Sequence, residues 1–288
     1  MRMFSNQPRK IYRRNQLIEV ICQLRFPEIL KIEAHEPADF QDAIRQAYPQ
    51  YGKKLEPLPP KNVGGKMVEQ GTVNNYQFIS ADGAWKVSLT KGFIALSTTR
   101  YTRWEDFAKR LDVVLAAFIE TYQPSYFSRV GLRYMNALNK DAVGLEESSW
   151  RELIAPGYLG LMADDDSARQ NFIKCEQTVT ATMPGGAKAN IKCGPGLLRK
   201  VDNRTRQVEE QKVFLLDLDV FFDGKMPLGQ VAGALNIVHD NAGSLFAGAV
   251  RRRASGRNGA HGRVNQAAKT GTDEWVCPCF DFSRLSAV

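Results

Sequence analysis

"KVFLLDLDVFF", residues 212–222, is the stretch that decides the fold of this 288-residue chain. In an extended segment, its even-numbered positions place five apolar side chains on one face, namely Phe214, Leu216, Leu218, Val220 and Phe222. A period of two over this length predicts a half-buried β-strand. Pro227 follows, and the apolar residues from Val231 to Ala249 recur at helical spacing, which predicts that the strand leads into a helix.

A similar order of elements is predicted earlier in the chain. "AWKVSLT" (84–90) and "FIALSTT" (93–99) alternate in the same way, and Lys91-Gly92 between them suits a hairpin turn. A helix is predicted over 102–122, with Thr102 and Glu105 forming a capping box at its start. "YFSRVGLRYMNAL" (126–138) and the opening "NQLIEVICQLRFPEIL" (15–30) are both predicted to be strands.

The second half of the chain gives weaker patterns in a comparable order. "SWRELIAPGYLGLM" (149–162) predicts a helix, and "NFIKCEQTVTATM" (171–183) predicts a strand that turns at Gly185-Gly186. We therefore predict an α+β fold, a mainly antiparallel sheet with helices packed on one face, in two similar halves of hairpin, strand and helix. The predicted halves are residues 15–140 and 141–250, packed as one unit.

Two stretches rich in proline and glycine are interpreted as loops. "KKLEPLPPKNVGGK" (53–66) carries the residues of an irregular connection. In "CGPGLLRK" (193–200) the glycines lie beside Arg199 and Lys200, as in a phosphate cradle. The spacing matches neither the Walker motif nor the dinucleotide fingerprint, so a tight loop between strands is the favoured interpretation.

The net charge of +8 is concentrated at the two ends of the chain. Residues 1–14 hold five basic residues and no acid, and residues 251–288 hold seven basic residues and three acids. The body, residues 15–250, then has 27 basic against 28 acidic residues, which gives little support to a nucleic-acid surface. No apolar run reaches the roughly 20 residues of a membrane span, and the start lacks a secretory apolar core, so we expect a cytoplasmic protein.

From residue 251 to residue 288 the composition changes abruptly. No helical or strand period continues there, and the preceding helix ends without a cap. One permissible set of codons for residues 252–264, read one base over, encodes a leucine- and methionine-containing helix end, Gly-Pro and then a stop. We expect either a disordered basic tail or an out-of-frame end, and sequencing the gene distinguishes the two.

Histidine and cysteine provide few candidates for catalysis. His261 lies in the tail, His35 precedes a predicted helix, and His239 borders an apolar stripe, where a buried and hydrogen-bonded histidine is the favoured interpretation. Cys175 and Cys193 flank the predicted second hairpin, and free thiols are expected for a reducing cytosol. No paired ligand set for zinc or other cofactor is apparent, so none is predicted.

One set of carboxylates has the pattern of a metal-dependent nuclease. Asp217 and Asp219 share a strand face, and Glu210 with Lys212 has the Glu-x-Lys spacing that such enzymes use to hold an ion and activate water. Asp202 would supply a further carboxylate. The favoured interpretation is that these residues form the solvated face of a half-buried strand.

Two arginines on the strand over 126–138 are candidates for binding. Arg129 and Arg133 flank Gly131 on one face and could hold an anion or a carboxylate of a partner. The favoured alternative is structural, with Arg133 paired to Glu19 or Asp217 on neighbouring strands. Glu19 and Arg25, inside the apolar opening strand, are likewise expected to form polar pairs near its ends.

Three motifs together, "LIEVICQLRFP" (17–27), "RVGLRYMN" (129–136) and "LLDLDVF" (215–221), resemble a sporadically distributed family of bacterial proteins of unknown function. The resemblance spans about residues 15–250 and implies no activity, cofactor or site residue. The neutral body and the scarcity of histidine favour a non-enzymatic cytosolic protein that binds another protein. The alternatives are a metal-dependent phosphodiesterase or nuclease, and a nucleic-acid binder acting through the basic ends.

Overall fold

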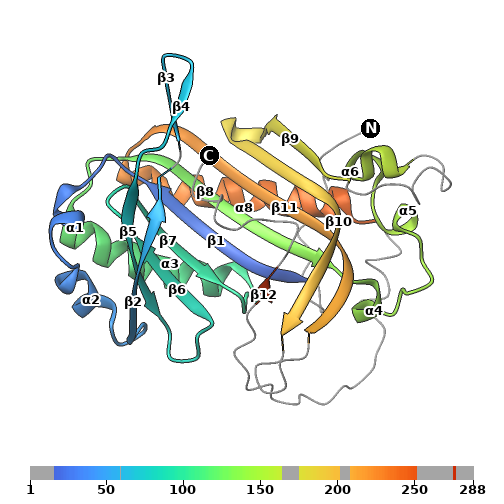
Figure 1. Cartoon of the computed structure of the whole chain (residues 1–288), viewed down its shortest axis with the longest axis horizontal. Coiled ribbons are helices and arrows are strands. Elements are labelled where there is room, and N and C mark those ends of the chain that lie inside the picture. The colour runs from blue at the N-terminus through green and yellow to red at the C-terminus, as the bar shows by residue number, and fades with distance from the viewer. Residues whose placement is uncertain (1–15, 59, 164–174, 202–207, 252–274, 277–288) are drawn as a thin grey trace. The chain divides into compact units, whose positions relative to one another are not determined.

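The computed structural model describes residues 16–58, 60–163, 175–201, 208–251 and 275–276 (Figure 1). These residues form an antiparallel sheet with helices, so the predicted α+β class is confirmed. The chain divides into two compact units that are discontinuous in sequence, whereas the predicted halves, 15–140 and 141–250, were continuous. Among the described residues, unit 2 comprises 19–132 and 221–235, and the rest belong to unit 1. The division is discontinuous because strands β1, β8 and β11 each contribute residues to both units.

Unit 2 is built on strands whose hydrogen-bonding order differs from their order in sequence. The order is β8 (Phe127–Leu138), β1 (Leu17–Arg25), β7 (Phe93–Thr98), β6 (Trp85–Leu89), β5 (Thr72–Ile79) and β2 (Gln50–Pro57). The pairs from β1 to β2 are antiparallel. Cys22, Leu96, Val87 and Phe78 lie opposite one another in turn, so these buried side chains form one row on one face.

The core of unit 2 lies between this face and two helices. The apolar stripe of α3 (Trp104–Tyr122) buries Phe107 and Phe118, and Phe107 lies 5.7 Å from the ring of Trp85 on β6. From α2 (Ala38–Ile44), Phe40 meets Phe78 of β5 edge to face at 5.4 Å. Both helices therefore cover the same face, and Figure 1 shows α3 behind β6 and β7. Each fully buried aromatic side chain stabilises the unit by about 1.5–3 kcal/mol relative to exposure.

Two details of unit 2 differ from the sequence predictions. The predicted loop 53–66 contains the end of β2 and most of a separate hairpin, β3 (Lys61–Val63) and β4 (Lys66–Val68), so that interpretation was wrong. The predicted capping box is also absent, since α3 has Arg103 at its N-cap position and the Thr102 hydroxyl instead bonds the Asp106 carboxylate. The short helix α1 (Leu30–Ala34) was not predicted.

Unit 1 has its own strand order and one long helix. The order is β12 (Trp275–Val276), β10 (Lys188–Val201), β11 (Val208–Met226) and β8, with β9 (Gln177–Thr182) also paired to β10. Helix α8 (Val231–Ala249), whose residues from Asn236 onward belong to unit 1, lies behind β11 in Figure 1. Short helical segments complete the unit, namely α4 (Lys140–Val143), α5 (Trp150–Leu153), α6 (Pro156–Leu159), η1 (Gly160–Ala163) and η2 (Pro184–Gly186). A further short helical turn, η3 (Leu228–Gln230), precedes α8 in unit 2.

The core of unit 1 contains buried side chains of β11, α5 and α8. Phe214 is fully buried, as the alternation predicted, and its ring lies 5.6 Å from that of Trp150 on α5. Val238 and Leu245 of α8 are also fully buried, and the Tyr158 hydroxyl donates to the Leu245 carbonyl at 3.1 Å. The predicted single helix over 149–162 is divided into α5, α6 and η1, because Pro156 begins a new helix and Gly160 has a φ of 55°.

The segment 193–200 is part of strand β10, so its interpretation as a tight loop was wrong. Its glycines are needed because atoms of neighbouring segments lie very close to this part of the strand. A Cβ on Gly194 would lie 2.3 Å from the main-chain oxygen of Cys175, and one on Gly196 would lie 2.5 Å from the side chain of Leu215. In the tail, Trp275 and Val276 pair with β10, and the expectations for residues 252–274 and 277–288 lie outside the described residues.

No helix within the described residues combines the length and the apolar character that crossing a membrane requires.

Candidate functional site

Asp217, the first of the predicted metal-binding carboxylates, is held by an arginine. Its Oδ1 accepts a hydrogen bond from Arg133 Nε at 2.7 Å, and its Oδ2 pairs with Arg133 Nη2. The two side chains, of Arg133 and Asp217, are only 14% and 8% exposed, so Asp217 does not belong to a solvated face as the sequence interpretation had it. This bidentate pair is one of the two structural pairings considered for Arg133, and it leaves the carboxylate engaged with a cation.

The other residues of the predicted metal site do not gather around Asp217. Glu210 accepts a hydrogen bond from Arg199 at 2.6 Å on an exposed part of β11, Lys212 is exposed, and Asp219 is partly exposed. Asp202 lies outside the described residues. Within the ranges that the structure describes, no three histidine, cysteine or acidic side chains are placed to hold a metal ion.

In unit 2, Arg129 packs its guanidinium on an aromatic ring. Its Cζ lies 4.3 Å from the centre of the Phe221 ring, and its Nη1 would lie 2.3 Å from a Cβ added to Gly131. Only 9% of Arg129 is exposed, so this predicted binding residue is largely covered. Arg25 donates to the Gln23 side chain at 3.1 Å, and Glu19 is partly exposed on the same strand.

His239 is buried and hydrogen-bonded, which confirms the favoured interpretation. Its Nδ1 lies 2.7 Å from the hydroxyl of Tyr134, and both residues are at least 91% buried. The three cysteines in the described residues are free thiols, as expected, and two of them, Cys22 and Cys193, are buried. Burial, and then the nearby Cys175, raises the pKa of Cys193 to about 12, so this thiol is a poor nucleophile at neutral pH.

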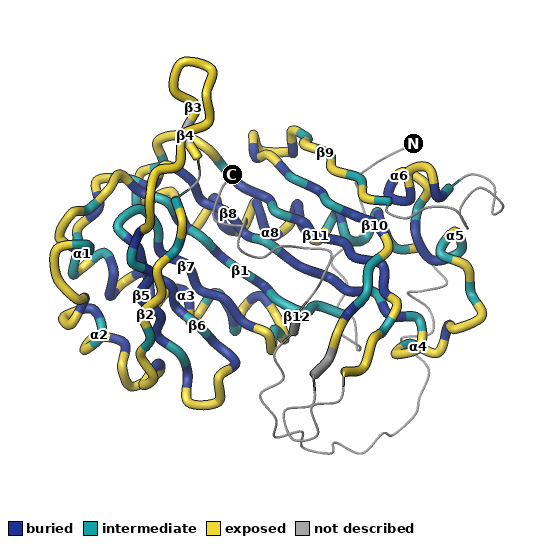
Figure 2. The backbone as a smooth tube through the Cα atoms, viewed as in Figure 1, coloured by how far each residue is buried: buried dark blue, intermediate teal, exposed yellow. Residues whose placement is uncertain are grey.

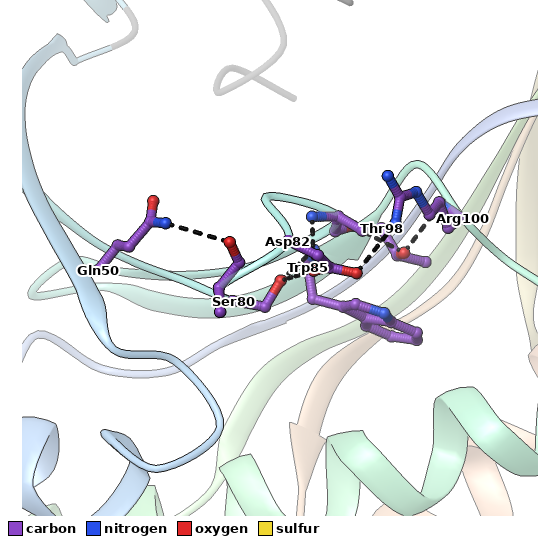
Figure 3. Close-up of polar contacts among 8 residues, drawn as sticks. Gln50, Ser80, Asp82, Trp85, Thr98 and Arg100 are labelled. Carbon is purple, nitrogen blue, oxygen red and sulfur yellow. Dashed lines mark hydrogen bonds and ion pairs between the residues drawn. The ribbon is translucent and has the colours of Figure 1, made fainter. Parts of the chain in front are cut away.

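Figure 3 shows a polar network at the turn between β5 and β6. The Asp82 carboxylate accepts hydrogen bonds from the Ser80 hydroxyl at 2.6 Å and the Ala84 N–H at 3.1 Å, and it pairs with Arg100 at 3.1 Å. The Ser80 hydroxyl oxygen also accepts from the Trp85 N–H at 3.0 Å. These bonds close the turn, so the network holds the hairpin in register.

Replacing Asp82 with alanine should lower the free energy of unfolding by about 1 kcal/mol at pH 7, because the turn loses its acceptor. The bonds from Ser80 and then Ala84, supplemented by the charge of Arg100, lower the pKa of Asp82 in the fold. A carboxylate with a lowered folded pKa stabilises above its unfolded pKa of about 3.9 and loses this effect as the pH falls through the folded value. The difference between wild type and Asp82→Ala should therefore be constant from pH 7 to about 5 and shrink below about 4.

Urea unfolding of both proteins at each pH measures this difference, with Asp112→Ala on the exposed side of α3 as the control. A difference that stays equal from pH 7 to pH 3 would contradict the assigned role of the carboxylate.

The most conspicuous surface of the described residues is the hairpin β3–β4 and the strand before it (Figure 2). Half of the large apolar side chains that are exposed in the described residues lie between residues 51 and 68: Tyr51, Leu55, Val63, Met67 and Val68. Three of them are on the hairpin, and their exposed fractions are 58% for Val63, 66% for Met67 and 48% for Val68. We call these three residues the hairpin patch. Such clustering is uncommon on a surface that contacts only water.

The hairpin has a defined backbone despite its exposure. Gly64 and Gly65 have φ angles of 60° and 84°, which is the conformation of a two-residue turn that matches the twist of the strands. The Asn62 side chain accepts a hydrogen bond from the Gly65 N–H at 2.9 Å. Val63 faces Lys66 across the strands and residue 61 faces Val68, so both valines lie on one face and Met67 on the other.

Sequence reasoning missed this site because the segment was interpreted as a loop. The available signal was Gly64-Gly65 between two short β-forming runs, "KNV" and "KMV", which is a hairpin pattern. The prolines at 57, 59 and 60 masked it, since they also indicate an irregular connection.

No protein-family model matches the chain, and no curated protein matches it either. The resemblance of three motifs to a bacterial family therefore stays a prediction.

Proposed function

We propose that this protein is a non-enzymatic, cytoplasmic binding protein that docks onto another protein through the hairpin patch. The observation that carries the proposal is the exposure of Val63, Met67 and Val68 on a hairpin that forms a two-stranded sheet of its own. The catalytic alternative receives less support, because Asp217 and Glu210 are each engaged by an arginine.

Exposed apolar side chains on an isolated hairpin have a physical cost that docking removes. A two-stranded hairpin without a packed face is at best marginally stable in water. Every described side chain from Asn62 to Gln70 is exposed, so the hairpin gains little packing from its own unit. Burying an apolar side chain of this size in a partner contributes about 1 kcal/mol or more, and a partner groove that encloses the hairpin covers Val63 and Val68 on one face and Met67 on the other.

The charges on the hairpin indicate the chemistry of the partner. Residues 61–68 contain two lysines and no acidic residue. Lys66 is exposed and lies opposite Val63 on the valine-bearing face. A complementary surface would have an apolar recess with carboxylates at its rim, because charge complementarity orients partners and excludes like-charged competitors.

The proposal is tested by affinity capture from a lysate of the source cells with two triple variants. V63T/M67Q/V68T removes apolar surface while keeping side-chain size and the strand preference of the valine positions. The matched control V113T/L161Q/V208T makes the same kinds of change at exposed apolar positions elsewhere. We expect a stoichiometric partner that wild type and the control retain equally, and whose capture falls at least about tenfold with the hairpin variant.

A captured protein that the hairpin variant retains as well as wild type would overturn the proposal, as would capture of no stoichiometric protein by wild type. Circular dichroism of the three proteins should coincide, because the substituted side chains are exposed in the fold.

A further inference from the structure

Strand β2 is the last strand of its sheet in the described part of the chain. It pairs with β5 on one side, and it ends the strand order on the other. All eight of its residues, from Gln50 to Pro57, are exposed or partly exposed. The main-chain groups on the outer side of such a strand can pair with another extended strand.

Symmetry limits how two copies of β2 could pair with each other. A closed dimer requires a two-fold axis, and for antiparallel strands in one continuous sheet this axis is perpendicular to the sheet. Rotation about this axis leaves the same face of the sheet pointing in the same direction in both copies. Residues directly opposite one another must therefore come from the same face of β2, and one residue lies on the axis opposite itself.

The charges of β2 select one of these registers. With Leu55 on the axis, Lys54 of each copy lies opposite Glu56 of the other copy, and both opposite-charge pairs form at once. With the axis at 53 or 54 a lysine would face itself, and with the axis at 56 a glutamate would face itself. Opposite charges directly across two strands stabilise the pair, and like charges destabilise it.

We infer that β2 is a self-association edge, through which two copies of this chain form an antiparallel dimer centred on Leu55. Lysine on an edge strand normally discourages pairing. Here the glutamate two residues after Lys54, on the same face, gives that lysine a partner in one symmetric register alone. The inference does not rest on the proposed function, because it uses the edge of β2 and not the hairpin patch.

Contacts within unit 2 position the side chains of β2 for this pairing. Lys53 is engaged on the helix-covered face, 3.7 Å from Glu36 and 5.4 Å from the centre of the Tyr76 ring. Glu56 is positioned on the opposite face by a 2.5 Å hydrogen bond from the Asn75 side chain. Leu55 is 68% exposed, so pairing across the axis would cover two leucine side chains that now contact water.

Sedimentation velocity of the full chain tests the inference through charge reversal. We expect wild type to sediment with twice the mass of the 32.3 kDa chain at micromolar concentration. K54E places two glutamates opposite each other, and E56K places two lysines opposite each other, so each variant should raise the dimer dissociation constant at least about tenfold. The double variant K54E/E56K should dimerise like wild type, because the two pairs are restored with exchanged partners.

Mixing the two single variants is the most specific measurement. An equimolar mixture of K54E and E56K should form a heterodimer at concentrations where each alone is monomeric, since every glutamate then faces a lysine. A monomeric wild type at 100 µM (roughly the upper range of cytosolic proteins), or single variants that associate as well as wild type, would overturn the inference. V63T/M67Q/V68T should dimerise normally, and loss of the dimer in that variant would assign self-association to the hairpin instead.

Discussion

Replacing Asp217 with alanine should lower the free energy of unfolding by about 3–5 kcal/mol, which is a large part of the stability of an ordinary domain. The substitution removes the bidentate partner of Arg133, whose side chain is only 14% exposed, and leaves a positive charge largely excluded from water. Urea unfolding followed by circular dichroism measures the loss, and Asp112→Ala on exposed α3 should change stability by less than about 0.5 kcal/mol.

The double variant Arg133→Met with Asp217→Leu separates the charge from the packing. Because both charges are then absent, we expect most of the lost stability to return. The nuclease alternative predicts a different phenotype, in which Asp217→Ala keeps its stability and abolishes a magnesium-dependent cleavage of nucleic acid. That pair of results would contradict the structural role of the carboxylate.

Replacing Gly194 with alanine should lower the free energy of unfolding by about 2 kcal/mol or more. A Cβ at this position would lie 2.3 Å from the Cys175 main-chain oxygen and 3.3 Å from Glu176 Cα, and main-chain atoms cannot turn aside as a flexible side chain can. The main chain of Cys175 and Glu176, which leads into β9, would have to move away from β10. Thermal or urea unfolding detects the change.

The control for Gly194 is Gly243 in helix α8, where an added Cβ would point into open space, with no neighbouring element within 4 Å. Gly243→Ala should stabilise the protein by about 0.5–1 kcal/mol, because alanine has the higher helix propensity. If Gly194→Ala lowered the free energy of unfolding no more than Gly243→Ala does, the close contact described between β10 and Cys175 would be contradicted.

Strands and helices with a long, regular pattern could be predicted from the sequence. Periodicity alone located the strand at 212–222 and helix α3, although residues 213–218 of β11 are buried on both faces and not on one face as predicted. The prediction of a single helix over 149–162 was wrong. The apolar spacing of this segment resembles that of a helix, but Pro156 and Gly160 divide it. In this segment the backbone conformations of proline and glycine determine where the helices begin and end, and the spacing of the apolar residues does not.

The features that could not be predicted from the sequence depend on residues that are distant from one another in the chain. Arg133 and Asp217 are 84 residues apart, so the sequence offered Asp217 and Glu19 as equal choices. Gly194 and Gly196 resemble turn residues, and only the approach of Cys175 and Leu215 shows why β10 needs them. The hairpin patch was missed for a related reason, since its strands are three residues each and pair with nothing else in the described residues.

Photo-cross-linking from the hairpin tests the central claim most directly. A benzophenone amino acid placed at Met67 should, on irradiation in living cells, form one dominant cross-linked product with a distinct protein, and the same group placed at exposed Val113 should not. Mass spectrometry of that product should identify a surface with apolar residues bordered by carboxylates. Equal products from both positions, or none from Met67 at native expression levels, would contradict the assignment of the hairpin as the docking surface.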